Sequence, residues 1–367
     1  MTKMARLDME FDDFFNTNQP HVGLALDRYL REWPDDSTEK GKQFANFVGC
    51  ARGLPVSAFY PPAYQRWRDI MVEQAAQGNA YLWCGKVDGR LFLGTGGVSP
   101  LEAAVTLHHT YGLPSLPGSA LKGLARAYAS EKLDGQNRWI EQGQIDVLFG
   151  REPATVDGEW DGGDAGYVIF HDAWWIPGSN PHPLVREIVT VHHPNYYTSK
   201  GSTPATDFDS PTPNVQVAIQ GSFLFAVEGP PAWAAFAMKL LQAALQAWGA
   251  GAKTAAGYGY FDEDKTSQPS LNREIEQRKS LKSPPEGRLR NEWKDKKGDK
   301  LAKSLGRDWS KTWRDIEQRF PNVCEHQFGQ ILDEVCGETL RGWSGENEES
   351  NKYKANRQLI KLLSMNQ

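Results

Sequence analysis

Apolar residues follow two kinds of spacing in the first two thirds of the chain. Short alternating or continuous apolar runs are typical of strands, whereas repeats at i, i+3, i+4 and i+7 are typical of helices. Strands are expected at 81–87, 90–93, 166–177, 184–192, 215–219, 222–227 and 258–261. Helices are expected at 64–77, 119–130, 138–149 and 231–248. Interposed strands and helices of this kind predict a core of the α+β class.

Turn residues suggest how some of these elements are joined. Asp88-Gly89 separates two apolar runs and predicts a two-residue hairpin between 81–87 and 90–93. Residues 194–214 have no regular pattern and hold Tyr196 and Tyr197. A loop of that length in a compact domain is usually functional or disordered.

The pattern changes at residue 265, where aliphatic strands give way to charged helical repeats. Helices are expected at 271–282, 294–319, 324–340 and 356–363. We therefore predict two parts, a core over 1–264 and a mostly helical extension over 265–367. The extension carries 21 Lys and Arg against 16 Asp and Glu, which leaves 20 against 30 for the core. Nucleic acid binding by this acidic core would need a local basic groove.

Composition excludes several classes of protein. Hydrophobic residues make up 40% of the 367 residues, which is enough for a sizeable core. The four cysteines form no CxxC pair, so neither a disulfide framework nor a zinc site is expected. No apolar run reaches the roughly 18 residues of a membrane span, and no signal peptide is evident. We expect a cytoplasmic protein without membrane contact, cofactor or metal.

The segment 113–130 reads as a Pro- and Gly-containing loop that runs into a helix capped by Ser119. Lys122 and Arg126 lie four residues apart, away from the apolar stripe. Two interpretations are open. The segment is an ordinary capped amphipathic helix with solvated cations, or the helix end and the two cations form a phosphate site.

A glycine-rich loop at 249–259 follows the helix expected at 231–248. Its order of elements is the reverse of a Walker motif, in which the loop precedes the helix. Free backbone amides, one lysine and two tyrosines suit RNA phosphates and bases better than a nucleoside triphosphate. The loop residues expected to contact RNA are Lys253, Thr254, Gly257, Tyr258 and Gly259.

Some residues also fit a nuclease. Asp207 and Asp209 could hold a divalent metal, and the pairs His108-His109 and His192-His193 could supply a general acid or base. A lone carboxylate pair also fits an Asx turn beside Pro211, and paired histidines without nearby ligands also fit a structural role. His171-Asp172 cannot form a simple dyad, because adjacent strand residues point to opposite faces.

Two motifs resemble the RAMP family, the RNA-binding backbone proteins of CRISPR effector complexes. Residues 117–123, Pro-Gly-Ser-Ala-Leu-Lys-Gly, with Arg126 resemble the family's PGSSLKG..R motif, with Ala120 in place of a second serine. Residues 249–259 are similar to the family's glycine-rich loop. Four further segments in order, 21–29, 101–114, 168–174 and 193–211, resemble the sixth-numbered RAMP subunit of type III-B (Cmr) complexes. The resemblance covers most of 20–262 and leaves 265–367 outside it.

This resemblance implies a ferredoxin-like or RRM-like fold with long insertions, and a non-catalytic subunit. Such a subunit holds the guide RNA backbone towards its 3′ end. Its partners would be guide RNA, target RNA, the repeated RAMP backbone subunit, the small helical subunit and a neighbouring RAMP subunit. Its RNA contacts would be Ser119, Lys122, Arg126 and the loop residues named above, with Tyr196 and Tyr197 stacking on bases. RAMP relatives include nucleases, so a metal- or His-dependent endoribonuclease is the alternative.

Overall fold

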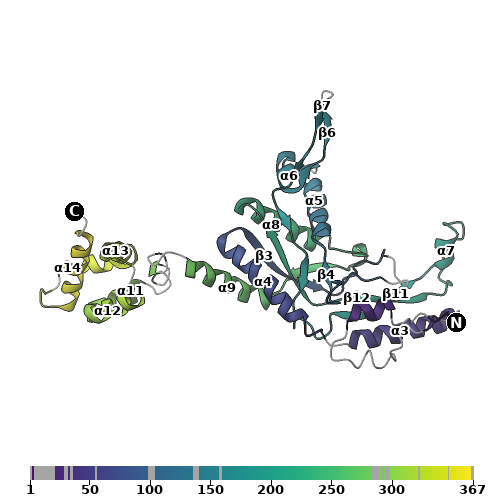
Figure 1. Cartoon of the computed structure of the whole chain (residues 1–367), viewed down its shortest axis with the longest axis horizontal. Coiled ribbons are helices and arrows are strands. Elements are labelled where there is room, and N and C mark those ends of the chain that lie inside the picture. Colours follow the sequence, from purple (N-terminus) through teal and green to yellow (C-terminus); the bar gives the residue numbers. More distant parts are fainter. Residues whose placement is uncertain are drawn as a thin grey trace. The chain divides into compact units, whose positions relative to one another are not determined.

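The computed structural model (Figure 1) places the chain in two compact units, Met1–Asn272 and Arg273–Gln367. The residues it describes are 2–3, 21–28, 32–33, 36–53, 56–97, 104–134, 140–156, 159–282, 287, 289–290, 293, 298–320, 323–345 and 347–364. Both units are built from the elements that follow, and the first contains strands as well as helices.

A six-stranded antiparallel sheet forms the centre of the first unit. Its strands are β3 (Ala80–Asp88), β4 (Ser115–Leu116), β9 (Ile169–Phe170), β10 (Ala173–Trp175), β13 (Ser222–Glu228) and β14 (Tyr260–Glu263). The order is β14-β3-β13-β10-β4, and β9 also pairs with β13. The expected α+β class is therefore confirmed.

Three long helices pack on or beside this sheet: α4 (Tyr60–Gln77), α5 (Gly118–Asp134) and α8 (Pro231–Ala247). Both α4 and α8 contact β3, and α5 packs against α8. The helix α8 is rich in Ala and Leu, and its apolar side chains are buried along its length. Because β13 is also buried nearly throughout, the core lies between these elements.

Aromatic rings tie α4 to the sheet. The Tyr60 ring stacks on Trp174 with centroids 5.8 Å apart, and the Tyr60 hydroxyl donates to the carbonyl oxygen of Trp175 at 2.6 Å. Trp67, two turns further along α4, stacks on the same Trp174 ring at 5.4 Å. Burial raises the pKa of Tyr60 far above its ordinary value. Its hydroxyl therefore stays protonated and keeps its role as a donor.

A two-stranded ribbon extends from the first unit. It pairs β11 (Leu184–Val191) with β12 (Thr212–Ile219) in continuous antiparallel register from Leu184↔Ile219 to Val191↔Thr212. The residues between the strands include the short helix α7 (Pro194–Thr198), which lies at the outer end of the ribbon in Figure 1. The segment expected as one irregular loop is thus partly helical.

Smaller elements complete the first unit. The strand pairs are β1 (Thr2–Lys3) with β2 (Glu32–Trp33), β5 (Gly150–Arg151) with β8 (Asp164–Ala165), and β6 (Ala154–Val156) with β7 (Glu159–Asp161). The helices are α2 (Val22–Arg28), α3 (Ser37–Gly53) and α6 (Gln142–Phe149). Arg138, where the last of these was expected to begin, lies outside the described residues.

Two predicted strands are wrong in detail. The turn at Gly89 forms, but the residues after it do not pair with β3. Leu91 bridges Ile219, and Phe92 bridges Ala252, because β3 already has β13 and β14 as neighbours. The strand expected at 166–177 is broken into β9 and β10 at His171-Asp172.

The second unit contains only helices among its described residues. The helix α9 (Ser267–Lys282) crosses the division between the units, and is followed by α11 (Gly298–Arg307), α12 (Trp309–Arg319), α13 (Glu325–Arg341) and α14 (Asn351–Ser364). Side chains from α11 to α14 share one apolar core around Leu305, Phe328 and Leu359. In the described ranges of either unit, we find no helix with the length and apolar character needed to span a bilayer.

Candidate nucleic-acid interface

The first turn of α5 is held by a side chain from another part of the chain. The carbonyl oxygen of Pro117 accepts a hydrogen bond from the amide of Ala120 at 3.0 Å, and the helix begins at Gly118. The Gly118 amide donates to Oδ1 of Asp172 at 2.7 Å. Ser119 lies exposed within the first turn, so the prediction that it caps the helix is wrong. The cap is a carboxylate from the break between β9 and β10.

This cap limits where a phosphate can bind. The amides at a helix N-terminus favour an anion, but here a carboxylate already occupies the Gly118 amide. A side chain at Gly118 would collide with the carbonyl oxygen of Phe170, so the helix end sits hard against β9. The glycine of the 117–123 motif therefore serves packing, and the cations further along α5 are better placed for phosphates.

Lys122 and Arg126 lie one turn apart on α5, and both are half-buried. Arg126 forms an ion pair with Glu152 at 3.7 Å, and the two side chains are 43% and 83% exposed. Such an exposed pair is worth at most about 1 kcal/mol, so a phosphate can replace the carboxylate. Within the described residues, Lys122 has no ion-pair partner. Of these two cations on α5, Lys122 is the more available to a ligand.

The glycine-rich loop is folded tightly against the segment that follows β3. Ala252 donates to the carbonyl oxygen of Phe92 at 2.8 Å, and Gly259 donates to that of Arg90 at 2.8 Å. Gly251 has a φ of 83°, and a side chain there would collide with the Phe92 carbonyl oxygen. The backbone crossing alone therefore requires glycine at this point, whatever the loop binds.

Lys253 is the cation of this loop and is exposed to solvent. It adopts a left-handed backbone with φ 61°, immediately before the 3-10 turn η1 (Thr254–Ala256). The Tyr258 ring packs on Phe92 with centroids 4.7 Å apart, so it is half-buried. Of the two, Lys253 can reach a ligand without a rearrangement of the loop.

A cavity of about 550 Å³ joins the two predicted segments. One wall is α5, through Ala120, Leu121 and Leu124, and the other is the loop, through Gly249–Gly251 and Thr254. The segments lie far apart in sequence, yet here they face one another, as the sequence interpretation requires. Mostly apolar side chains line the space, and Lys122, Arg126 and Lys253 belong to the same two segments but are not among the lining residues.

Tyr196 and Tyr197 belong to a different surface, the outer end of the β11–β12 ribbon. Both lie on α7, 41% and 67% exposed, with ring centroids 5.5 Å apart. Phe208, across the connection, is 98% exposed. Sequence reasoning missed Phe208, although an aromatic residue between two aspartates in a polar loop was a usable signal. Three aromatic rings are thus exposed to solvent on the connection between β11 and β12.

Hydrogen bonds order this connection. Asp209 Oδ2 lies 2.9 Å from His193 Nδ1, and its two carboxylate oxygens also accept from the amide and hydroxyl of Thr206. The hydrogen bond from His193 is the main cause of an Asp209 pKa below its ordinary value. Asp209 therefore stabilises the turn, which is the Asx-type alternative to a metal site.

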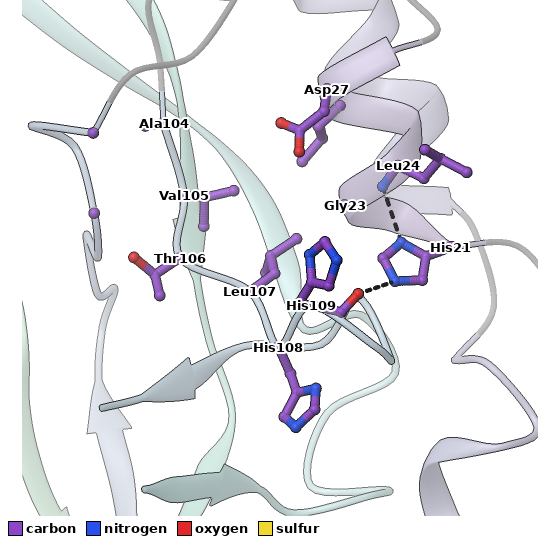
Figure 2. A pocket seen from close by; sticks show the side chains of 13 residues that line it. His21, Gly23, Leu24, Asp27, Ala104, Val105, Thr106, Leu107, His108 and His109 are labelled. Carbon is purple, nitrogen blue, oxygen red and sulfur yellow. Dashed lines mark hydrogen bonds between the residues drawn. The ribbon is translucent and has the colours of Figure 1, made fainter. Parts of the chain in front are cut away.

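A second cavity, of about 580 Å³, lies beside α2 and is lined by three histidines (Figure 2). His21 Nδ1 accepts from the Leu24 amide and His21 Nε2 donates to the carbonyl oxygen of His109, both at 2.9 Å. The Nδ1 atom accepts through its lone pair, and the carbonyl oxygen can only accept from Nε2. The His21 imidazole serves as the cap of α2 and joins that helix to the loop that carries His109.

The other two histidines of this cavity, His108 and His109, have different surroundings. His108 packs on Trp174 and Tyr111 at 5.1 and 4.7 Å between ring centroids. Burial is the main cause of a His108 pKa below its ordinary value, which favours the neutral ring. Figure 2 shows the His109 ring and the Asp27 carboxylate facing the same open space. Across the described residues, no cluster of three His, Cys, Asp or Glu has the arrangement of a metal site.

Comparison with known proteins finds a family likeness in the first unit. Residues 86–262, just under half of the chain, match the model of the RAMP superfamily. We call this matched segment the RAMP region. The RAMP region begins in β3 and ends in β14, so it includes α5, the glycine-rich loop and the ribbon. It includes His108 and His109 as well, but not His21 or Asp27.

Relatives narrow the likeness within the RAMP superfamily. The chain is 26% identical over 267 residues to the CRISPR system Cmr subunit Cmr6 of Pyrococcus furiosus, across 57% of this chain and 75% of that protein. A chain in the cryo-EM structure of the type III-B Cmr-β complex bound to cognate target RNA aligns with a TM-score of 0.46 at 16% identity, over 63% of this chain and 76% of that one. The crystal structure of Pyrococcus furiosus Cmr6 aligns with a TM-score of 0.31 at 27% identity, over 50% of this chain and 97% of that one. The sequence relationship supports a Cmr6-like RAMP protein.

Proposed function

We propose that this chain is a non-catalytic RNA-binding subunit of a type III-B CRISPR (Cmr) effector complex. It holds the guide RNA backbone towards its 3′ end and supports capture of target RNA in antiviral defence. One observation carries the proposal. Two family motifs that are distant in sequence, one in α5 and one in the glycine-rich loop, face each other across a single open cavity.

The cations on α5 and on the glycine-rich loop suit a sugar–phosphate backbone. Lys122 and Lys253 would contact phosphates directly, and Arg126 would exchange Glu152 for a phosphate. Ser119, Thr254 and the exposed backbone at Gly257 would add hydrogen bonds, with Tyr258 and Gly259 behind them. None of these groups reads a base edge, so the protein holds the RNA while guide pairing supplies sequence specificity.

The order of the sheet supports a ferredoxin-like plan for this RAMP region. Taken along the chain, β3, α5, β10, β13, α8 and β14 follow the order βαββαβ. In the sheet, the corresponding strands lie in the order fourth, first, third, second. The β11–β12 ribbon and the α6 region would then be the long insertions.

The ribbon would lie along the guide–target duplex. Tyr196, Tyr197 and Phe208 are exposed on its outer connection, where aromatic rings can stack on an unpaired base. The turn below them is already ordered by Asp209. The remaining surfaces would contact the repeated RAMP backbone subunit, the small helical subunit and a neighbouring RAMP subunit.

Charge reversal tests the RNA site in the assembled complex. Lys122→Glu and Lys253→Glu should each weaken guide RNA binding and flatten its dependence on salt, because each removes a phosphate contact. Lys239→Glu is the matched control, since this exposed lysine lies on α8, outside both family motifs. Equal affinity for all three variants and the parent would refute the site.

One observation supports the alternative function, a ribonuclease. His109 and Asp27 face the same cavity, where an imidazole and a carboxylate could share proton transfer. RNA cleavage by complexes with His109→Ala, Asp207→Ala or Asp209→Ala decides between the two functions. Cleavage should persist in all three. Its loss with assembly and RNA binding intact would make this chain a nuclease.

A further inference from the structure

The second unit lies outside the matched RAMP region and carries a surface that the proposed function does not use. Three basic residues on α14, Lys354, Arg357 and Lys361, are exposed and follow the spacing i, i+3, i+7. At about 100° per residue, this spacing places them along one stripe of the helix. The buried residues Ala355, Asn356, Leu359 and Leu362 lie on the opposite side.

The helix α11 repeats this arrangement. Lys300, Lys303 and Arg307 are exposed and have the same i, i+3, i+7 spacing. Leu301, Ala302 and Leu305 face the core. Each stripe spans about 10 Å along its helix axis. We call the two sets of three cations the α14 stripe and the α11 stripe.

The two helices that carry the stripes are neighbours. They contact one another, and the Asn351 side chain at the start of α14 donates to the carbonyl oxygen of Arg307 at 2.9 Å. Both bury their apolar sides in the same core. Two neighbouring helices of one unit thus each expose three cations to solvent.

Three arginines elsewhere in this unit have carboxylate partners. Arg290 pairs with Glu334 at 2.8 Å, Arg319 pairs with Asp315 at 3.6 Å, and Arg341 pairs with Asp333. Within the described residues, none of the six stripe cations forms an ion pair. The sequence of α14 has no acidic residue, and that of α11 has Asp299 alone.

Acidic residues gather elsewhere in the unit. Glu325, Glu334 and Glu338 are exposed on α13, and Glu348 and Glu349 precede α14. The last two reduce the positive potential near Lys354, so contact with an anion should centre on Arg357, Lys361 and the α11 stripe. Exposed cations that share a helix with few or no acidic residues are suited to bind a polyanion.

From this arrangement we propose that the two stripes form a second RNA-binding surface, which contacts the phosphate backbone without reading sequence. A row of long cations without an aromatic anchor fits phosphates, whereas protein interfaces have an apolar, often aromatic, centre. In the described part of this unit, the large apolar side chains exposed to solvent are Leu281 and Ile360, one on α9 and one on α14. They do not form such a centre.

The test uses the full chain and a fluorescein-labelled RNA of mixed sequence, either single-stranded or annealed to its complement. One variant combines Lys354→Gln, Arg357→Gln and Lys361→Gln, and another combines Lys300→Gln, Lys303→Gln and Arg307→Gln. The control combines Arg290→Gln, Arg319→Gln and Arg341→Gln, which changes net charge equally but at cations that already have partners. Fluorescence anisotropy over a range of salt gives the affinity and the salt slope.

Each stripe variant should weaken binding roughly tenfold and reduce the slope of log K against log salt by about two, as loss of three phosphate contacts requires. The control should keep the parent slope, and Lys354→Arg with Arg357→Lys and Lys361→Arg should restore both quantities. The duplex and single-strand arms identify which form the surface prefers.

Slopes for the stripe variants that match the control would overturn the proposal. Unchanged RNA affinity with loss of assembly into the complex would also overturn it, and would assign the stripes to an acidic protein partner. Lys122→Glu and Lys253→Glu measured in the same assay separate this surface from the RAMP site. If only Lys122→Glu and Lys253→Glu lose RNA binding, the RAMP site is supported and the stripes do not bind RNA.

Discussion

The Gly118 amide donates a hydrogen bond to the Asp172 carboxylate at 2.7 Å, and this bond joins the start of α5 to the break between β9 and β10. It explains two features at once. The helix needs an acceptor for a free amide, and the strand must be interrupted so that the acceptor can turn towards it. The start of α5 is therefore positioned by the sheet.

Replacement of this carboxylate should loosen the first turn of α5. Asp172→Ala removes the acceptor and should cost about 1 kcal/mol, the usual effect of losing a helix cap. Asp172→Asn keeps an acceptor and should cost less. Hydrogen exchange of the α5 amides measures the change locally, which avoids a single unfolding transition for a chain of two units. Equal protection in all three proteins would contradict the capping role.

Replacement of Asp172 should also change RNA affinity. Asp172→Asn removes a negative charge at the start of α5 while keeping an acceptor for the Gly118 amide, so RNA affinity of the proposed site should rise modestly.

Two glycines of the loop provide a matched steric comparison. Gly257 and Gly259 both have positive φ, 88° and 79°, but only Gly259 faces an obstacle, the carbonyl oxygen of Ala250. Gly257→Ala should cost about 1–2 kcal/mol through backbone strain alone. Gly259→Ala should cost clearly more, because the backbone crossing must open. Denaturant unfolding of the two variants measures the difference, and equal losses would contradict the crossing as the reason for glycine.

Phe208 should contribute to binding and not to folding. Its side chain is 98% exposed, so Phe208→Ala should change the free energy of unfolding by less than about 0.5 kcal/mol. Loss of a base–aromatic stack should weaken RNA binding by about 1–3 kcal/mol. Ile188→Ala, at an exposed apolar position on β11, is the control for loss of surface area. Target RNA binding by the assembled complex is the measurement, and parent-like affinity would rule out stacking by Phe208.

His108 should make folding sensitive to mild acid. Burial lowers its pKa most, His109 and His21 lower it further, and Asp172 opposes them. The unfolded chain then holds the proton more tightly than the folded chain. This stabilisation is full above the unfolded-state pKa near 6.5 and is lost as the pH falls below it. Denaturation midpoints across that range should depend less on pH in His108→Gln, and an unchanged dependence would contradict the assignment.

Elements with strong local patterns were predictable. The strands at 184–192 and 222–227 and the helix at 231–248 are confirmed, with ends shifted by a residue or two. In each, apolar spacing and flanking turn residues agree with the tertiary environment. The meeting of α5 with the glycine-rich loop followed from the family resemblance, because spacing along the chain carries no information on a contact so distant in sequence.

The failures have tertiary causes. Residues 90–93 have the composition of a hairpin strand, yet both edges of β3 are taken by β13 and β14. The run 166–177 has the apolar content of one strand, yet Asp172 must face α5. Ser119 has the chemistry of a cap, yet the close contact of Gly118 with β9 sets the helix start earlier. In all three, a partner from elsewhere in the chain overrides a sound local preference.

Two glycines of the glycine-rich loop are required by the backbone crossing, whatever the loop binds. Because the fold itself requires Gly251 and Gly259, a descendant that no longer handled RNA would have to retain them. Lys253 is exposed on the same loop, and its side chain is not required by the backbone crossing. A glycine signature in a distant homologue therefore reports the shared fold, whereas the lysine beside it is free to change with the ligand.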